Sequence, residues 1–121
     1  DVAIRNGNGG SYGGPSYSVY LSDRKKGQFV HHQALSELAE HLGMFTVDKK
    51  AKTIEVLDKS GCCWHSTERY KVINNRPVKV YSMEEDMASY DEKSQQSITV
   101  ITIKKLVNGK WVTKVIKKKG N

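Results

Sequence analysis

Residues 97–119 read SITVITIKKLVNGKWVTKVIKKK, and the fold class follows from this stretch. Apolar and polar side chains alternate on both sides of Asn108 and Gly109, which is the period expected of β-strands. An Asn-Gly pair between two alternating runs is the strongest short-range signal of a β-hairpin, because both residues tolerate positive φ. We therefore predict an antiparallel hairpin with a two-residue turn at Asn108 and Gly109.

The same alternation extends outward through most of the chain. Two further pairs of alternating runs are joined by short polar turns: 44–48 with 53–58, and 63–73 with 76–84. Residues 2–4 and 17–21 flank a glycine-rich segment and are expected to pair across it. The acidic segment 83–96, MEEDMASYDEKSQQ, is expected to form an exposed connection.

One stretch has the spacing of a helix. Residues 31–43, HHQALSELAEHLG, place four apolar side chains on one side of a helix: Ala34, Leu35, Leu38 and Leu42. Gly43 supplies a C-terminal stop. We predict a mainly β fold, an antiparallel meander that is sandwich-like or barrel-like, with one short helix.

The length of 121 residues suits a single core, so we expect one domain over residues 1–121. No apolar run approaches the roughly 18 residues that span a bilayer. The chain begins DVAIRN, without a methionine, and is expected to lack a native N-terminal segment.

Positive charge is concentrated near the C-terminus. The net charge is +7, and eight lysines with no acidic residue follow from Lys93 onward. Such a surface could bind nucleic acid or another polyanion. The same lysines could instead protect an edge strand from aggregation, and the stretch lacks the arginines that base recognition favours.

Candidate catalytic and metal-binding groups are few. Cys62 and Cys63 are neighbours, so they could be free thiols, a vicinal disulfide, or paired outside this chain. Cys63 and His65 would share one face of a strand, which would allow a thiolate and imidazole pair as well as simple packing. The acidic cluster at 84–86 could hold a cation or form a solvated loop. We expect a protein without catalytic activity of its own.

Residues 7–17, GNGGSYGGPSY, combine five glycines and a proline with Tyr12 and Tyr17. Glycine allows a narrow or strained backbone, and tyrosine offers rigid amphipathic area at low entropic cost. The segment is therefore either an idle tether or a shaped binding loop. The predicted partner-binding residues are Asn8, Gly9, Gly10, Ser11, Tyr12, Gly13, Gly14, Ser16 and Tyr17.

Residues 1 to about 85 resemble a family of small bacterial periplasmic proteins. The resemblance rests on DVAIRNGNGG with GGPSY at the N-terminus, on FTVDKKAKTIEV, and on KSGCCWHSTERYKV. The family comprises immunity proteins and lysozyme-inhibitor-like domains that neutralise peptidoglycan hydrolases, including effectors delivered by type IV or type VI secretion systems. It implies a β-rich fold, a periplasmic location and a secreted peptidoglycan hydrolase as the protein partner.

The resemblance also implies a mode of action. In related inhibitors a projecting loop with Ser, Gly and Tyr plugs the cleft of the enzyme, and SYGGPSY is similar in kind. Some members bind calcium through a D-x-[DN]-x-D-G-type loop, of which Asp1 would match the last acidic position. The resemblance thus implies an inhibitor of a lysozyme-like glycoside hydrolase, with Asp1 as a possible Ca²⁺ ligand. The alternative from the residues alone is a polyanion-binding or cell-envelope-binding module that uses the lysine-rich C-terminal hairpin.

Overall fold

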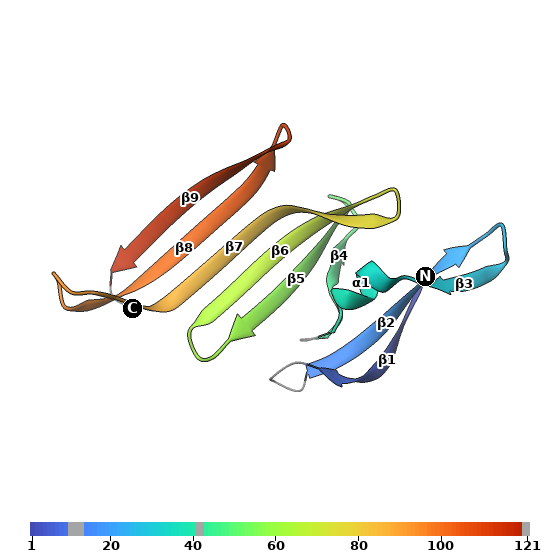
Figure 1. The fold of residues 1–121 in the computed structure, drawn as a ribbon, viewed down its shortest axis with the longest axis horizontal. Coiled ribbons are helices and arrows are strands. Elements are labelled where there is room, and N and C mark those ends of the chain that lie inside the picture. The colour runs from blue at the N-terminus through green and yellow to red at the C-terminus, as the bar shows by residue number, and fades with distance from the viewer. Residues whose placement is uncertain (10–13, 41–42, 120–121) are drawn as a thin grey trace. The chain divides into compact units, whose positions relative to one another are not determined.

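The computed structural model describes residues 1–9, 14–40 and 43–119, and it shows two antiparallel sheets with one short helix (Figure 1). The three-stranded sheet has the order β1-β2-β3, with bounds Val2–Gly9, Gly14–Asp23 and Gln28–His31. The helix α1 spans Gln33–Glu37. The six-stranded sheet runs in chain order from β4 to β9: Thr46–Asp48, Thr53–Ser60, Trp64–Ile73, Arg76–Asp91, Gln96–Val107 and Lys110–Lys119. The prediction of a mainly β, antiparallel fold is confirmed, and neither sheet closes into a barrel over the described strands.

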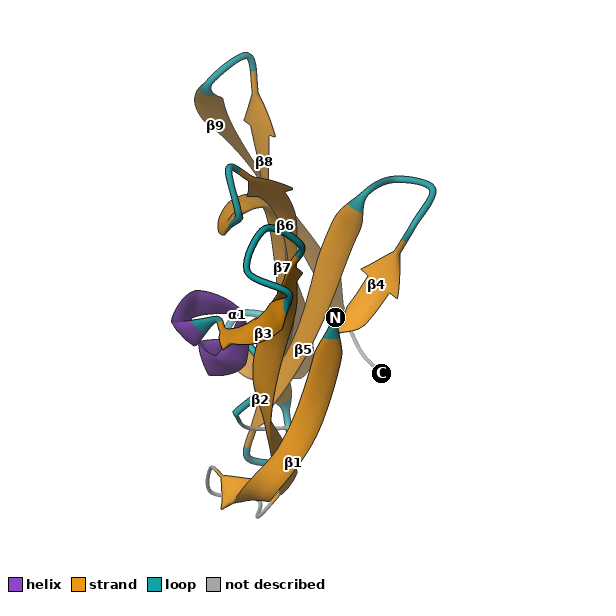
Figure 2. Ribbon diagram, turned by 90° about the vertical axis from the view of Figure 1, so that its right-hand side faces the viewer, coloured by secondary structure: helices purple, strands orange, loops and turns teal. Residues whose placement is uncertain are grey.

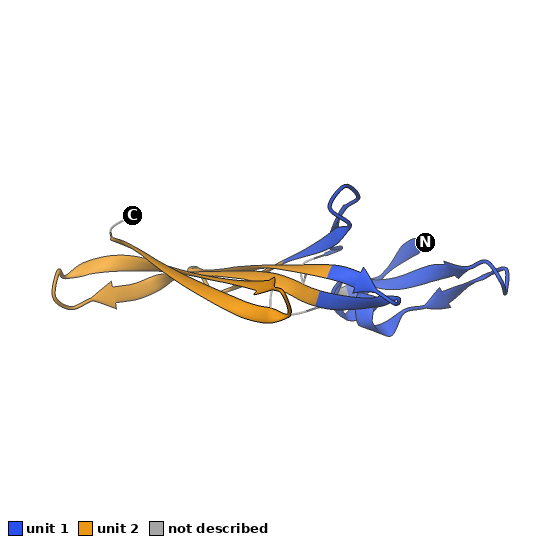
Figure 3. Ribbon diagram, turned by 90° about the horizontal axis from the view of Figure 1, so that it is seen from above, with its two compact units in different colours: residues 1–56, 71–78 blue, residues 57–70, 79–121 orange. Residues whose placement is uncertain are grey.

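The chain divides into two compact units (Figure 3). Unit 1 comprises Asp1–Val56 and Lys71–Val78, and unit 2 comprises Leu57–Tyr70 and Lys79–Asn121. The division falls within strands β5, β6 and β7, which contribute residues to both units. That residues 1–121 form a single domain stays a prediction.

The turns that join the strands have the expected backbone geometry. Asn108 and Gly109 have φ values of 50° and 77°, and Val107 pairs with Lys110 across them. Asn74 and Asn75, between β6 and β7, have φ values of 51° and 61°. Positive φ at both central residues is typical of two-residue hairpins, whose twist matches that of the flanking strands. Both turn predictions are confirmed.

Replacing Gly109 with valine should destabilise the protein by about 1–2 kcal/mol, because a β-branched residue would be forced into a left-handed conformation. No other atom lies near the position of the added Cβ, so the cost is one of backbone strain. Urea unfolding of Gly109→Val and Gly109→Asn measures it, since asparagine tolerates this conformation. Equal stability of the two variants would show that φ at Gly109 does not matter.

The expectation of an exposed connection at 83–96 is wrong. Strand β7 continues to Asp91, and its pairs with β8 run from Tyr81↔Lys105 to Asp91↔Gln96 with an irregularity between Asp86 and Ser89. The segment is polar and therefore gives no strand signal of its own, but it pairs with the strongly β-forming run 98–103. Pairing with that run overrides the weak local preference.

The helix is shorter than the sequence predicts. His32 caps its N-terminus, because the ring Nδ1 accepts a hydrogen bond from the amide of Leu35 at 3.1 Å. At the other end the Ala39 amide donates to Ser36 O, and Ala39 O accepts from the Tyr17 amide at 2.9 Å. These bonds turn the chain out of the helix before residue 40. Leu42 lies outside the described residues, and no described helix is long and apolar enough to cross a membrane.

Burial differs between the two units. Among the described residues, unit 1 buries four apolar side chains, Val19, Leu35, Ala39 and Ile54. Val19 lies on β2 and Leu35 on α1, and these two elements contact each other (Figure 2). Of the described residues of unit 2, only Ser66 is buried. The strands of unit 2 instead leave large apolar side chains exposed, among them Val112 at 55% and Val115 at 54%. The described residues of unit 2 therefore form no closed apolar core.

Candidate functional site

The β1–β2 hairpin carries the glycine-rich segment at its tip. The predicted pairing of residues 2–4 with 17–21 is confirmed, beginning with Val2↔Tyr20 and Ala3↔Val19. The ladder continues to Asn8↔Pro15 and Gly9↔Gly14, so the flanks of the segment are ordered strand. The register shifts between Arg5 and Gly7, where Gly7 has a φ of 150°. A β-bulge of this kind increases the local twist of a hairpin and redirects its end.

Side-chain hydrogen bonds stiffen the hairpin below its tip. The side-chain Nδ2 of Asn6 donates to the Ser18 hydroxyl at 2.7 Å, and the Ser16 hydroxyl donates to Asn6 Oδ1. The two bonds hold β1 against β2 at the bulge. The sequence offered no signal for Asn6, whose role depends on the register.

Ser36 on α1 joins the hairpin to the rest of unit 1. It is buried, its hydroxyl accepts from the Val19 amide at 2.8 Å, and it donates to His32 O at 2.7 Å. The His32 amide donates to Val19 O at 2.8 Å, so β2 is fixed to the start of the helix from both sides. The helical spacing of residues 31–43 gives no signal for this role of Ser36.

His32 connects the start of α1 to the β6–β7 turn. Its Nδ1 accepts from Leu35, and its Nε2 contacts the carbonyl oxygen of Asn75. An acceptor Nδ1 with a donor Nε2–H is one tautomer of neutral imidazole. The hairpin is thus supported on a base of backbone and side-chain bonds.

The structure places the predicted binding residues in three groups. Gly10, Ser11, Tyr12 and Gly13 lie outside the described residues. Asn8, Gly9 and Gly14 end the paired strands. Ser16 is buried with its hydroxyl committed to Asn6, and Tyr17 is half-buried, so these two are suited to supporting the tip.

The side chain of Asp1, the predicted Ca²⁺ ligand, forms a hydrogen bond within the protein. Its Oδ1 accepts a hydrogen bond from the Ser22 amide at 2.8 Å. Across the described residues, no group of three His, Cys, Asp or Glu side chains is placed to hold an ion. A Ca²⁺ ligand role for Asp1 stays a prediction.

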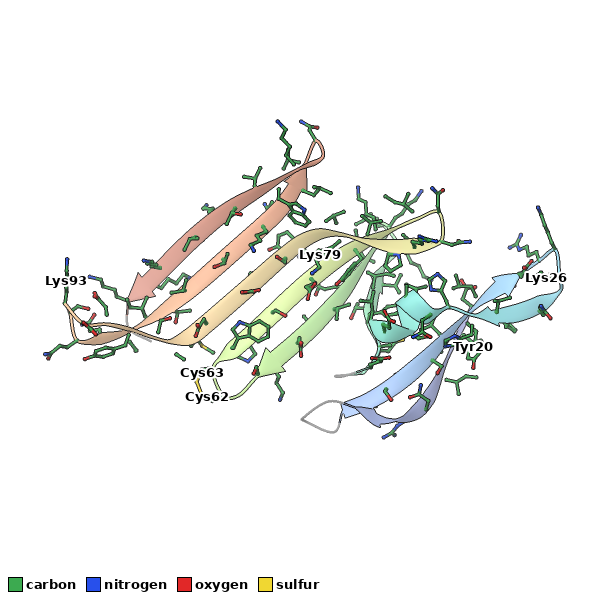
Figure 4. All side chains as sticks on the ribbon, viewed as in Figure 1. Tyr20, Lys26, Cys62, Cys63, Lys79 and Lys93 are labelled. Carbon is green, nitrogen blue, oxygen red and sulfur yellow. A yellow bond between two sulfur atoms is a disulfide. The ribbon has the colours of Figure 1, made fainter. Side chains whose placement is uncertain are left out.

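The two cysteines form a disulfide with each other. Cys62 and Cys63 are joined in the turn between β5 and β6 (Figure 4). The carbonyl of Cys63 accepts from the Met87 amide at 2.7 Å, which attaches this turn to β7. A thiolate is the reactive form of cysteine, and a disulfide sulfur is not one. The alternative of a Cys63 and His65 nucleophile pair is therefore wrong for this state of the chain.

Unit 2 contains a polar cluster on β6 and β7. Tyr70 OH donates to Glu68 Oε2 at 2.8 Å, and the Lys79 ammonium forms an ion pair with the same oxygen (Figure 4). Burial alone would raise the pKa of Glu68, but the hydrogen bonds from Lys79 and Tyr70 and the charge of Lys79 hold it below its usual value. Burial and the bond to Glu68 raise the pKa of Tyr70 well above its usual value.

The Glu68 cluster should make stability depend on pH at the acid end. Because the folded-state pKa lies below the ordinary value of 4.5, folding favours the carboxylate, and its contribution is complete above that value. The contribution is lost as the pH falls through the folded-state pKa. It should stay below about 1 kcal/mol, because solvent screens the pair.

Unfolding free energies of the wild type and Glu68→Gln, measured at about pH 6 and about pH 3, test this effect. The wild type should lose more stability on acidification than the variant. An identical loss in both proteins would contradict it.

The lysines of β8 and β9 are exposed. Their alternation places Lys104 and Lys117 on one face of the sheet and Lys105 and Lys114 on the other. Lys119 approaches Asp91 at 3.9 Å. Both sides of this hairpin therefore carry positive charge.

The described residues define a β-rich protein whose β1–β2 hairpin is held by side-chain hydrogen bonds at Asn6 and Ser36. The sequence matches no protein-family model, and no curated protein matches it significantly. A solved structure described as a Xanthomonas type IV secretion system related protein is similar over 94% of this chain, with 30% sequence identity and a TM-score of 0.75. The aligned region covers 51% of that chain, so the present chain spans about half its length.

Proposed function

We propose that this chain is a secretion-associated protein of the bacterial envelope that binds and inhibits a peptidoglycan-degrading glycoside hydrolase. The observation that carries the proposal is the β1–β2 hairpin, whose paired flanks end at Gly9↔Gly14 and lead into the glycine and tyrosine segment. The similarity to a type IV secretion system related protein supports the association with secretion.

The mechanism follows from the chemistry of the two surfaces. A glycoside hydrolase binds its sugar chain in a cleft that carries a pair of carboxyl groups. A narrow glycine backbone can enter such a cleft, while a tyrosine ring fills a sugar subsite and its hydroxyl donates to a carboxylate. The supported base at Asn6 and Ser36 limits the entropy lost on binding. The chain itself contributes no catalytic group and acts in the periplasm.

Inhibition assays test the proposal directly. Purified lysozyme-like hydrolases, including those that are substrates of secretion systems, are assayed on peptidoglycan with and without the protein. Saturable inhibition of at least one enzyme, with formation of a complex of the two proteins on size-exclusion chromatography, is the expected result. Failure of every such enzyme to bind would overturn the proposal.

The exposed lysines of β8 and β9 favour a second candidate, a polyanion-binding module. It predicts retention on heparin that falls steeply with salt and that does not depend on the hairpin tip. Retention that survives replacement of the tip, together with absent hydrolase binding, would favour this candidate.

A further inference from the structure

We infer that one face of unit 2 is a binding site for an uncharged oligosaccharide. An open groove of about 430 Å³ crosses this face from β6 to β9, entirely within unit 2. Both tryptophans of the chain, Trp64 and Trp111, line it. The site is distinct from the β1–β2 hairpin, which belongs to unit 1.

Strand register brings the lining residues to one face. Trp64, Ser66 and Glu68 occupy alternate positions of β6 and so share a face. On the neighbouring strands, Ser82 pairs with Lys104, which pairs with Thr113. Strands lie about 4.8 Å apart, so a groove that crosses from β6 to β9 spans roughly 14 Å. That length suits a chain of sugar rings better than a single one.

The aromatic groups can provide stacking area. Trp111 is 46% exposed, and Trp64 is half-buried, so both indoles can meet a ligand. An indole ring offers a large apolar face and one N–H donor, which matches a pyranose ring with its apolar C–H face and polar edge. Ligand sites commonly combine such aromatic walls with a few polar groups that fix orientation.

The polar lining is balanced in charge. It contains two carboxylates, Glu68 and Glu84, and two ammonium groups, Lys79 and Lys104, and Glu68 and Lys79 form an ion pair. A site for single-stranded nucleic acid would combine aromatic stacking with a positively charged groove, whereas the charges of this lining cancel. A lipid would not match a lining of charges and hydroxyl groups. Hydroxyl-rich, uncharged ligands can donate to the carboxylates and accept from the lysines and serines.

Tryptophan fluorescence gives a direct test, because every tryptophan of the chain lies in this groove. The probes are chitotetraose and cellotetraose as neutral oligosaccharides, with a heparin tetrasaccharide and an oligothymidylate as polyanions. A saturable change with a neutral sugar is expected, together with shifts of the indole N–H resonances in ¹H–¹⁵N spectra. Failure of both neutral sugars by both methods overturns the inference, and so does binding confined to the polyanions.

A matched pair of variants separates the groove from the opposite face. Trp111→Ala should weaken binding of the neutral sugar at least about tenfold, the scale of one lost aromatic stacking contact. Val112→Ala alters the adjacent side chain, which is similarly exposed but lies on the other face, and should leave binding unchanged. Melting curves check that both variants fold, and equal binding by both overturns the inference. The groove inference does not depend on the proposed hairpin function: if the hairpin does not inhibit a hydrolase, the expected sugar binding is unchanged.

Discussion

Replacing residues 9–14 by an Asn-Gly turn should strongly weaken inhibition of the cognate hydrolase while the protein stays folded. The replacement keeps the pair Asn8↔Pro15 and closes the hairpin with a favoured two-residue turn. It removes the segment proposed to enter the enzyme cleft. The loss should be at least roughly 30-fold in the inhibition constant, equivalent to about 2 kcal/mol, as for a central interface anchor.

Two tyrosine variants refine the same experiment. Tyr12→Ala should leave the unfolding free energy nearly unchanged and weaken binding by roughly 2 kcal/mol or more. Tyr17→Ala should cost more in stability than in binding, because Tyr17 is half-buried in β2. Tyr90→Ala, at a position 59% exposed in unit 2, is the matched control. Full inhibition by both the shortened hairpin and Tyr12→Ala would show that the segment is only a tether.

Ser36→Ala should produce one of the largest losses of folding stability of any single substitution in unit 1. The change removes the acceptor of the buried Val19 amide and leaves that N–H without its partner. An unsatisfied buried donor costs about 1–3 kcal/mol. For a unit of this size that corresponds to a melting temperature lower by about 4–8 °C per kcal/mol.

Ser18→Ala is the control for Ser36→Ala. It is the same chemical change on β2, but the hydroxyl of Ser18 is more exposed and accepts only from the Asn6 side chain among the described bonds. Water can replace that bond, so its loss should stay near a few tenths of a kcal/mol. Thermal unfolding followed by circular dichroism compares the two. Equal destabilisation by the two variants would show that the buried Ser36 hydrogen bond contributes no more to stability than the exposed Ser18 bond.

The strands that the sequence predicted correctly share a local cause. Alternation of side chains and positive-φ turn residues act within a few positions, as at Asn108 with Gly109 and at Asn74 with Asn75. These strands and turns can therefore be predicted without knowing any contact with a distant segment. The hairpin at residues 2–21 follows for the same reason, with its glycine-rich segment at the tip.

The errors have the opposite cause. The second half of β7 has little β preference of its own, and its pairing with β8 holds it in a strand. The helix ends early because its last turn exchanges hydrogen bonds with β2. In both cases hydrogen bonding to another strand outweighs the local preference.

By itself, the sequence determined the fold class, the turns and the position of the candidate binding segment, since these depend on local backbone preference and on side-chain alternation. Only the tertiary structure decided which side chains meet. The support of the hairpin by Ser36 and the groove between Trp64 and Trp111 depend on strand register. Register is set by pairing across the sheet, and a shift of one residue would move the side chains of the shifted strand to the other face.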